Sequence, residues 1–449
     1  MNNDFENTKH AVSLLLNQIK QSPTAFHAVD VIKHALCDAG FLPLYEQSEW
    51  SMMRGGKYFV TRNDSSLLAF VIPKGDEPLH GYRVVAAHTD SPAFKLKDTF
   101  ARPGAGYEKL NVERYGGMIC SSWMDRPLSI AGRVLVETPT GIESKLVNID
   151  RPCAIIPNVA IHMDRSANDG KSYNAQVDML PVLGLENNAC SFKNQLADVL
   201  GVEVDRILAH DLFLYTAQDG YIWGQNQEMI SAPRLDDLAC VFGGLQAFLQ
   251  ADYSSASHIS VFAAFDNEEV GSQTLQGAAS SFFGDVIDRI EYFLGNCGGD
   301  VTGKARRLSE SLMLSADNAH AVHPNHPEYA DAQNRPVIGG GIVLKFNAQQ
   351  RYATDAIGAA LFRKICALAD VPVQTFANRS DMLGGSTLGN IASTRLPIRT
   401  IDIGLPQLAM HSAFETAGTY DYLQYISVCE AFYRAEITKE QDQGYLVKG

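Results

Sequence analysis

Five short segments of the chain carry imidazole and carboxylate groups, the side chains that most often hold divalent metal ions in proteins. The segments are His88-Thr89-Asp90, Arg234-Leu235-Asp236-Asp237, Asp266-Asn267-Glu268-Glu269, Ser315–His320 and Met410-His411. Each is expected at or just after the carboxyl end of a strand, or at the matching start of a helix, where ligands gather in open α/β sheets. Two zinc ions about 3.5–4 Å apart need one bridging carboxylate and two further ligands each. Two His, two Asp and an adjacent Glu pair meet that requirement with one Glu left over, so we predict a two-metal hydrolytic site.

The adjacent glutamates indicate what the remaining carboxylate would do. Glu268 and Glu269 repel each other if both are buried without a partner. A bound dication removes that repulsion for one of them, which leaves its neighbour free to act as a general base on water. Asp90 follows His88 by two residues and can hold the imidazole in the tautomer that binds a metal.

Each segment taken alone also has a purely structural interpretation. The histidine after a strand can cap a turn, and an acidic loop can simply be solvated in so acidic a chain. Asp236 can N-cap the helix that follows, the segment after Ser315 can form an Asx turn, and His411 can be an exposed loop residue. The agreement of all five positions favours the metal site.

The elements that must position these groups alternate between strand and helix in the second half of the chain. We expect strands at His258–Phe265, Ser311–Ala316, Gly341–Phe346, Val373–Ala377 and Arg399–Ile403, and helices at Leu238–Leu249, Phe283–Leu294, Asp355–Ala369 and Tyr420–Ile437. Two earlier apolar runs, Ser66–Pro73 and Tyr82–Ala87, have the pattern of strands that are buried on both faces. This alternation predicts an α/β fold with a largely parallel sheet covered by helices on both faces.

The middle of the chain has a different pattern, with several glycine turns and short strands such as Gly132–Glu137 and Ile207–Tyr215. One helix near Phe192–Leu200 interrupts these strands. We interpret this region as a mostly β domain inserted into the α/β domain. The expected division is 1–92 and 233–449 for the α/β domain and 93–232 for the insertion.

The composition limits the remaining classes of protein. The 449 residues are 46% hydrophobic, and 37 Lys and Arg face 51 Asp and Glu, for a net charge of −14. That balance argues against binding to nucleic acid or to an anionic membrane surface. No apolar run approaches the roughly 20 residues that a membrane span needs. Eight Cys without a CxxC pair indicate reduced thiols, so we expect a cytoplasmic globular protein.

Taken together, the motifs resemble those of the aspartyl aminopeptidases. The matching segments cover nearly the whole chain in the family's order: SPTAFHA, AAHTDSPAFKLK, MDRPLSIAGRV, APRLDDL, DNEEVGS, SADNAHAVHPNHPE, KFNAQQRYATDA, GGSTLG and MHSAFE. The segment Asp381–Gly385 is similar to the bacterial form of the family. The resemblance implies a three-layer α/β/α zinc-peptidase domain with an inserted β-rich dimerisation domain. It also implies a di-zinc enzyme that removes an N-terminal Asp or Glu from peptides.

The resemblance assigns a role to each expected metal ligand. Asp236 would bridge two zinc ions in every subunit, and Asp237 would be only its neighbour. His88 and Asp317 would complete one site, and Glu269 and His411 the other. Carboxylate-rich sites accept several divalent ions, so manganese or cobalt could replace zinc in one of them.

The same resemblance implies a set of residues that contact the substrate. Lys345 and Tyr352 match positions that line the pocket for the acidic side chain, and His320 and His323 match positions near the substrate. On their own, Lys345 would be interpreted as a solvated lysine and Tyr352 as a core aromatic. His162 matches a histidine that a neighbouring subunit supplies, in a family whose dimers assemble into dodecamers.

By the same resemblance, Glu268 would be the general base: it would take a proton from the water that bridges the metals, and the resulting hydroxide would attack the scissile carbonyl. Asp90 would orient His88. Two alternatives stay open on the residues alone. A related co-catalytic zinc carboxypeptidase or deacylase could use Lys345 to bind a terminal carboxylate. A non-catalytic, zinc-stabilised shell protein would need a degraded site, whereas every expected ligand and the base are present.

Overall fold

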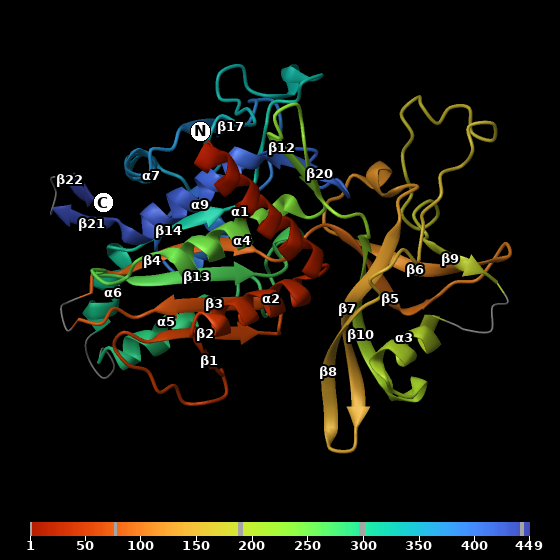
Figure 1. The fold of residues 1–449 in the computed structure, drawn as a ribbon, viewed down its shortest axis with the longest axis horizontal. Helices are drawn as coiled ribbons and strands as arrows, with labels where there is room; N and C mark the ends of the chain where they lie inside the picture. The colour runs from red at the N-terminus through yellow and green to blue at the C-terminus, as the bar shows by residue number, and fades with distance from the viewer. Residues whose placement is uncertain (1, 76–78, 187–191, 296–300, 441–443) are drawn as a thin grey trace.

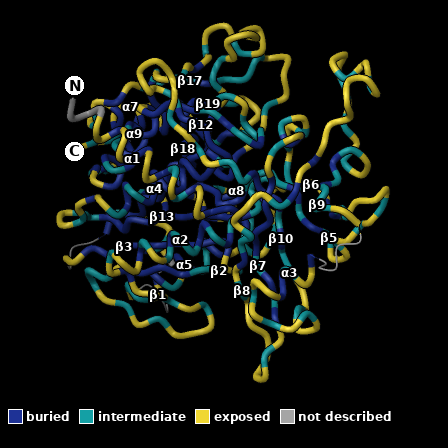
Figure 2. The backbone as a smooth tube through the Cα atoms, turned by 45° about the vertical axis from the view of Figure 1, so that its right-hand side comes forward, coloured by how far each residue is buried: buried dark blue, intermediate teal, exposed yellow. Residues whose placement is uncertain are grey.

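The computed structural model describes residues 2–75, 79–186, 192–295, 301–440 and 444–449. A larger α/β body that contains both chain ends lies beside a smaller, β-rich body (Figure 1). The buried residues are concentrated in the strands and in the inner faces of the helices, while the loops at the rim are exposed (Figure 2).

The larger body is built on one mixed sheet. In the described residues it has nine strands, in the order β1 (Leu42–Leu44), β2 (Lys57–Arg62), β3 (Ser66–Val71), β13 (Ile259–Phe265), β4 (Tyr82–His88), β14 (Leu312–Ala316), β18 (Arg399–Gly404), β16 (Ile342–Phe346) and β17 (Val373–Ala377). The four central strands β13, β4, β14 and β18 are parallel to one another. Strand β3 is antiparallel to both of its neighbours and β16 is antiparallel to β18, so the predicted parallel arrangement holds for the centre of the sheet.

Helices cover both faces of this sheet. One face packs against α1 (Asn2–Gln21), α2 (Ala25–Asp38), α4 (Leu235–Gln250), α7 (Ala356–Leu368) and α9 (Thr419–Arg434). The other packs against α5 (Phe282–Phe293), α6 (Val301–Ser309) and α8 (Leu388–Arg395). The two cores share strand β4, where Val85 and Ala87 face the first core and Val84 and Ala86 the second. The strand has a near-continuous apolar sequence because both of its faces are buried. The three-layer α/β/α prediction is confirmed.

The smaller body has a sheet and a core of its own. Its six strands run in the order β8 (Gly141–Asn148), β7 (Leu128–Thr138), β10 (Ile207–Thr216), β5 (Ala93–Ala101), β6 (Tyr107–Tyr115) and β9 (Val182–Leu185). Helix α3 (Phe192–Leu200) contributes Phe192 and Leu196 to its apolar core.

A third sheet lies outside both bodies' main sheets and was not predicted. It has the order β11 (Tyr221–Trp223), β12 (Met229–Ala232), β20 (Glu415–Gly418), β19 (Pro406–Leu408) and β15 (Ala319–His320). Strands β11 and β12 fall within 93–232, yet β12 pairs with β20 from the end of the chain. Short strands that pair over such a sequence separation leave almost no local signal.

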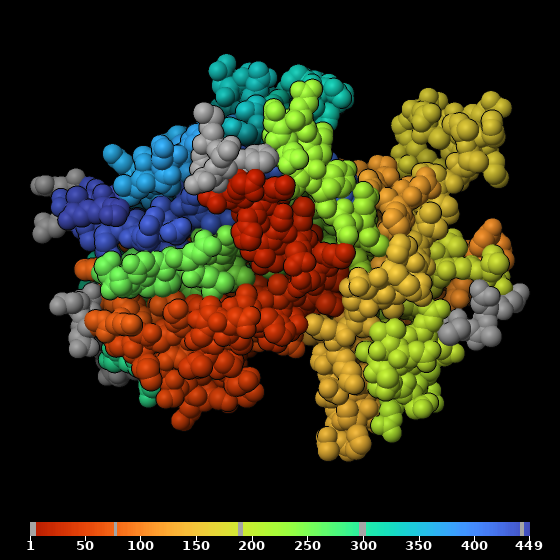
Figure 3. Space-filling view, in the orientation of Figure 1, coloured from red at the N-terminus to blue at the C-terminus, as the bar shows by residue number. Residues whose placement is uncertain are grey.

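Arg133 joins the two bodies. Its Nε donates to Asp211 at 2.9 Å, and its other nitrogens donate to the backbone and side-chain oxygens of Asn63, in the turn between β2 and β3. Its guanidinium lies 4.4 Å from the centre of the Phe26 ring on α2. The contact of the red N-terminal segment with the gold strands is visible in Figure 3.

The predicted closing helix, Tyr420–Ile437, is wrong at its carboxyl end. Helix α9 stops at Arg434, and Glu436–Glu440 forms strand β21, which pairs with β22 (Gly444–Lys448). Ile437 is buried, and its carbonyl oxygen accepts a hydrogen bond from Arg83 Nη2 at 3.0 Å. That tertiary contact favours the strand over continued helix. Among the described residues, no helix combines the length and the apolar character of a bilayer span.

Candidate metal centre and active site

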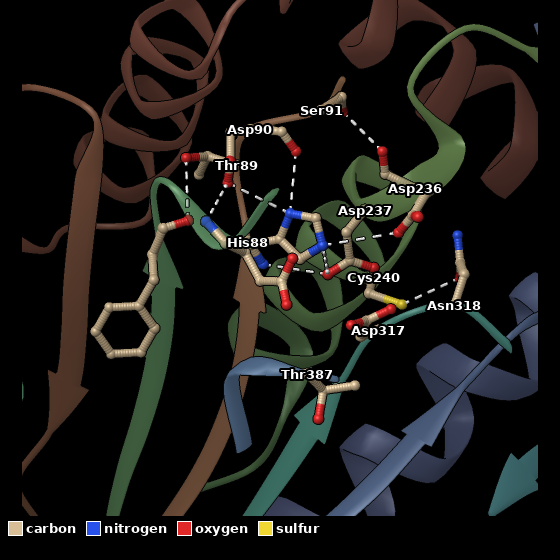
Figure 4. Close-up of polar contacts among 12 residues, drawn as sticks. His88, Thr89, Asp90, Ser91, Asp236, Asp237, Cys240, Asp317, Asn318 and Thr387 are labelled. Carbon is tan, nitrogen blue, oxygen red and sulfur yellow. Dashed lines mark hydrogen bonds and ion pairs between the residues drawn. The ribbon is translucent and has the colours of Figure 1, made fainter. Parts of the chain in front are cut away.

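The expected ligands converge because the central strands are parallel and in register. His88 ends β4, and its register partner on β13 is Phe265, which directly precedes the acidic segment with Glu268 and Glu269. On the other side of β4, strand β14 ends one residue before Asp317. Three neighbouring strands therefore deliver their ligands to one edge of the sheet, as Figure 4 shows for His88 and Asp317.

The two remaining expected ligands, Asp236 and His411, lie in irregular segments rather than in the main sheet. Asp236 lies at the start of α4, where its backbone angles (φ −86°, ψ 106°) are not helical. His411 lies in the turn after β19 and has a positive φ of 65°. The small third sheet is adjacent to both segments, since β12 ends at Ala232 and β19 ends at Leu408.

Asp236 lies between the two histidines. Its Oδ1 is 3.7 Å from His88 Nε2, and its Oδ2 is 3.4 Å from His411 Nε2, which is also 3.3 Å from Glu269 Oε1. Ligand atoms within 4.8 Å of one another form three groups: His88, Glu268 and Glu269; His88, Asp236 and Asp237; and Asp236, Glu269 and His411. Asp236 thus belongs to one group with each histidine, which is the position of a bridging ligand.

Asp317 stands slightly apart from these groups. It lines the same cavity as the other ligands, but its Oδ1 lies 3.3 Å from the ammonium of Lys345. His320, Lys345 and Tyr352 also line this cavity, together with the loop of Gly385, Ser386 and Thr387.

His162 and His323 do not line the cavity of their own chain. His162 is exposed in the long connection between β8 and β9 of the smaller body. His323 is also exposed, and its ring lies 5.4 Å from that of His326.

The cavity concentrates negative charge in a buried place. Burial, together with repulsion from Asp317, Asp90 and Asp236, raises the pKa of Glu268 to about 8, although His88 opposes the shift. Burial likewise raises the pKa of Glu269. For His411, burial acts to lower the pKa, but the contact with Asp236 and the charge of Glu269 outweigh it and raise that pKa to about 10.

The donor set fits a divalent metal. Within the described residues, Asp236 Oδ1 and Glu269 Oε1 are buried without a hydrogen-bond partner. An unpartnered buried carboxylate oxygen is costly, and a dication supplies the missing partner. Two imidazoles with several carboxylates are the ligand set of hydrolytic zinc sites.

Asp90 organises the backbone of the acidic segment. Its Oδ1 accepts a hydrogen bond from the amide of Glu268 and its Oδ2 one from the amide of Glu269, both at 3.1 Å. His88 Nδ1 lies 3.0 Å from the backbone oxygen of Asp90 and 3.4 Å from its Oδ1. Tyr115, at the end of β6 in the smaller body, donates its hydroxyl to Asp90 Oδ2 at 2.6 Å and accepts from Asn267 Nδ2 at 2.8 Å.

Sequence reasoning missed Tyr115, and it missed two acidic residues that hold ligand backbones. Asp237 is fully buried, and its Oδ2 accepts from the amide of His88 at 3.1 Å. Glu415 accepts from the amides of Asp236 and His411. The only sequence signal for Glu415 was its place in the MHSAFE motif, four residues after His411.

An α/β sheet that gathers histidines and carboxylates into one buried cavity is typical of a metal-dependent hydrolase. A family model described as aminopeptidase I zinc metalloprotease (M18) matches residues 18–433. A probable M18 family aminopeptidase 2 of Clostridium acetobutylicum is 46% identical over 440 residues, which cover 96% of this chain and 100% of that protein. The chain therefore belongs to the M18 family of zinc metalloaminopeptidases.

Solved structures agree with this assignment. The chain is similar to one described as the Ape4 and Nbr1 complex, with a TM-score of 0.92 and 35% identity over 96% of this chain and 86% of that one. It is also similar to the S. cerevisiae mApe1 dodecamer, with a TM-score of 0.82 and 27% identity over 96% and 97% of the two chains. The predicted family resemblance is confirmed, and membership in an aminopeptidase family gives no support to the carboxypeptidase, deacylase and shell-protein alternatives.

Removing the metal should destabilise the folded protein, because the buried carboxylates would lose their counter-charge. At free zinc about 1,000-fold above its Kd, binding contributes roughly 4 kcal/mol to the free energy of unfolding. We expect a chelator to lower Tm by several degrees and zinc, but not magnesium, to restore it in calorimetry. Magnesium is the control because it prefers octahedral oxygen ligands. An identical Tm with and without chelator would contradict a metal in this cavity.

Proposed function

We propose that this metalloaminopeptidase holds two zinc ions in each subunit and removes acidic residues from peptide N-termini. Asp236 would bridge the ions, His88 and Asp317 would bind one of them, and Glu269 and His411 the other. The observation that carries the substrate proposal is Lys345, a buried cation in the wall of the ligand cavity. Manganese or cobalt in one of the two sites is compatible with such a ligand set.

The ions, when bound, would act as Lewis acids that polarise the scissile carbonyl and lower the pKa of water. Glu268 is the group of this chain that would move the proton. It would take a proton from the attacking water and return it to the leaving amine. Its position supports both steps, since its carboxyl group lines the cavity beside the proposed ligands. Asp90 would keep Glu268 in place through the backbone amide.

Lys345 would select the substrate's side chain. Its side chain is buried, and its ammonium donates to the carbonyl oxygen of Asn318 at 2.8 Å, beside Asp317. Burial acts to lower the pKa of Lys345, but Asp317 and the other acidic neighbours outweigh it, so the group stays charged. An ammonium has three N–H groups, and these contacts leave one for a substrate carboxylate. The Tyr352 ring, 5.3 Å away, adds a cation–π contact.

The substrate proposal is tested with a panel of aminoacyl anilides. Asp- and Glu-anilides should be cleaved faster than Ala-, Leu- and Asn-anilides, and N-acylated amino acids should not be cleaved. A preference for apolar N-terminal residues would overturn the acidic selectivity while leaving aminopeptidase activity in place.

We also propose that residues 93–232 mediate the assembly of dimers into a dodecamer, and that His162 completes the site of a neighbouring subunit. The connection around His162 is exposed and carries accessible apolar side chains, with Ile161 48% and Met163 82% exposed. The dodecameric state of the similar mApe1 structure supports this. The described cysteines are free thiols, which supports a reducing, cytoplasmic location.

The assembly proposal predicts a particle of about twelve times the 49.1 kDa chain in size-exclusion light scattering. Replacing Met163 with Asp would bury a charge in the proposed contact, so we expect smaller species with reduced activity. A monomer with full activity would remove His162 from the site.

Replacing Glu268 with Gln should remove the base and keep the metals. General acid–base catalysis contributes roughly 10²–10⁴-fold, so we expect kcat to fall by about that factor. The bound zinc, measured by elemental analysis, should stay at the wild-type level. Near-normal turnover in Glu268→Gln would show that another group takes the proton.

Replacing Lys345 with Met keeps most of the length of the side chain and removes its charge. A charge-assisted hydrogen bond is worth about 1.5–3 kcal/mol, and about 1.4 kcal/mol corresponds to tenfold. We expect kcat/KM for Asp-anilide to fall roughly ten- to a hundredfold, while neutral substrates change little. The assay needs saturating zinc because Lys345 also contacts Asp317. The same substitution at the exposed Lys364 on α7 is the control. Equal losses for both substrate classes would end the selectivity proposal.

A further inference from the structure

Glu415 links two metal-site segments that are far apart in the sequence. Its Oε2 accepts a hydrogen bond from the amide of Asp236 at 2.9 Å, and its Oε1 accepts one from the amide of His411 at 2.7 Å. Glu415 as a residue is 1% exposed, so water does not compete for these hydrogen bonds. One carboxylate therefore fixes the backbone of the proposed bridging ligand and that of a histidine ligand.

Both segments need such support because their local backbone is irregular. Arg234, two residues before Asp236, has a φ of 57°, and His411 itself has a φ of 65°. Residues other than glycine seldom adopt positive φ, and they keep it only when the surrounding structure holds them there. Neither segment belongs to a strand of the main sheet, so the register that places His88 does not act on them.

The small third sheet is what brings Glu415 to both segments. Strand β20 starts at Glu415 and pairs with β12, where Ala232 is the register partner of Glu415. On its other side β20 pairs with β19, where Leu408 faces Thr416. Asp236 follows Ala232 by four residues, and His411 follows Leu408 by three. The third sheet thus places the Glu415 carboxylate between the Asp236 segment and the His411 segment.

Two acceptor oxygens are needed to meet both amides, one for each. Gln offers a single oxygen acceptor, and its NH₂ group would face one of the two backbone N–H donors. A buried donor without an acceptor costs about 1–3 kcal/mol. The substitution Glu415→Gln therefore removes one of the two hydrogen bonds with almost no change in shape.

We infer that Glu415 is a positioning residue that fixes Asp236 and His411 relative to each other and thereby sets the affinity of the metal site they share. This inference rests on the proposed metal ligands. The side chains it positions are already close, with His411 Nε2 3.4 Å from Asp236 Oδ2. Groups that orient metal ligands typically change metal affinity 10–100-fold when they are altered.

The chain provides a matched control on helix α9. Asp421 is also fully buried, and its two oxygens accept hydrogen bonds from the amides of Gly339 and Gly341 at 2.7 and 3.0 Å. It does not line the metal cavity. Asp421→Asn therefore damages the same kind of double hydrogen bond at a place unrelated to the metal.

The experiment measures the zinc dissociation constants of the full-length protein by competition with a chelator, beside Tm. We expect Glu415→Gln to weaken at least one of the two zinc dissociation constants about 10–100-fold, and Asp421→Asn to lower Tm with unchanged zinc affinity. Excess zinc should restore most of the kcat of Glu415→Gln, because Glu268 is untouched. Unchanged affinity in Glu415→Gln, or an equal loss in both variants, would overturn the inference.

Glu415→Asp is a second variant that keeps the charge and withdraws the carboxylate by one methylene. It should also bind zinc more weakly than the wild type, and wild-type affinity would overturn the inference. If neither Glu415 variant folds, Glu415 is a determinant of the fold and the inference is withdrawn. A wild-type protein that binds no zinc would instead overturn the proposed ligands, so the two failures are distinguishable.

Discussion

Negative charge buried around Asp236 is the constraint on which the whole site depends. Carboxylates at these distances in a medium of low dielectric constant repel one another strongly. The protein compensates mainly with backbone amides: Asp90, Asp237 and Glu415 each accept N–H groups from the segments that carry the metal ligands. These hydrogen bonds occupy both oxygens of Asp90 and Glu415 and one oxygen of Asp237, whereas Asp236 Oδ1, Asp237 Oδ1 and Glu269 Oε1 have no hydrogen-bond partner. The uncompensated charge is therefore collected where a dication is needed.

Two kinds of structure share the task of positioning. Parallel strands in register deliver His88, the acidic pair and Asp317, and this part depends on the large apolar core on both faces of the sheet. The Asp236 and His411 segments depend on strands of only three or four residues in the third sheet. The positions of His88, the acidic pair and Asp317 are therefore as stable as the main fold, whereas those of Asp236 and His411 depend on local hydrogen bonds.

The sequence was sufficient for the central strands, because a short, near-continuous apolar run such as Tyr82–Ala87 is typical of a strand buried on both faces when strands and helices alternate along the chain. The predicted carboxyl ends of those strands were enough to place His88 and Glu268 at one edge of the sheet. The third sheet could not be predicted, since β12 and β20 are short and far apart in the chain. The roles of Asp237 and Glu415 were hidden for a different reason: a side chain that accepts from backbone amides leaves no spacing pattern. His162 and His323 are exposed and do not line the cavity of their own chain.

Tyr115 has a consequence for how this architecture can be modified. Its hydroxyl reaches from the β-rich body to Asp90 and Asn267, so the smaller body completes the hydrogen bonding of a residue in the larger one. The insertion is therefore not an exchangeable module. A chimera that receives a foreign insertion would need an equivalent phenol at the end of the strand matching β6, at the same depth and angle. Without that phenol the chimera would keep both apolar cores but lose the hydrogen bonds that hold its acidic segment. Recombination within this architecture must therefore preserve the contacts between the two bodies as well as the bodies themselves.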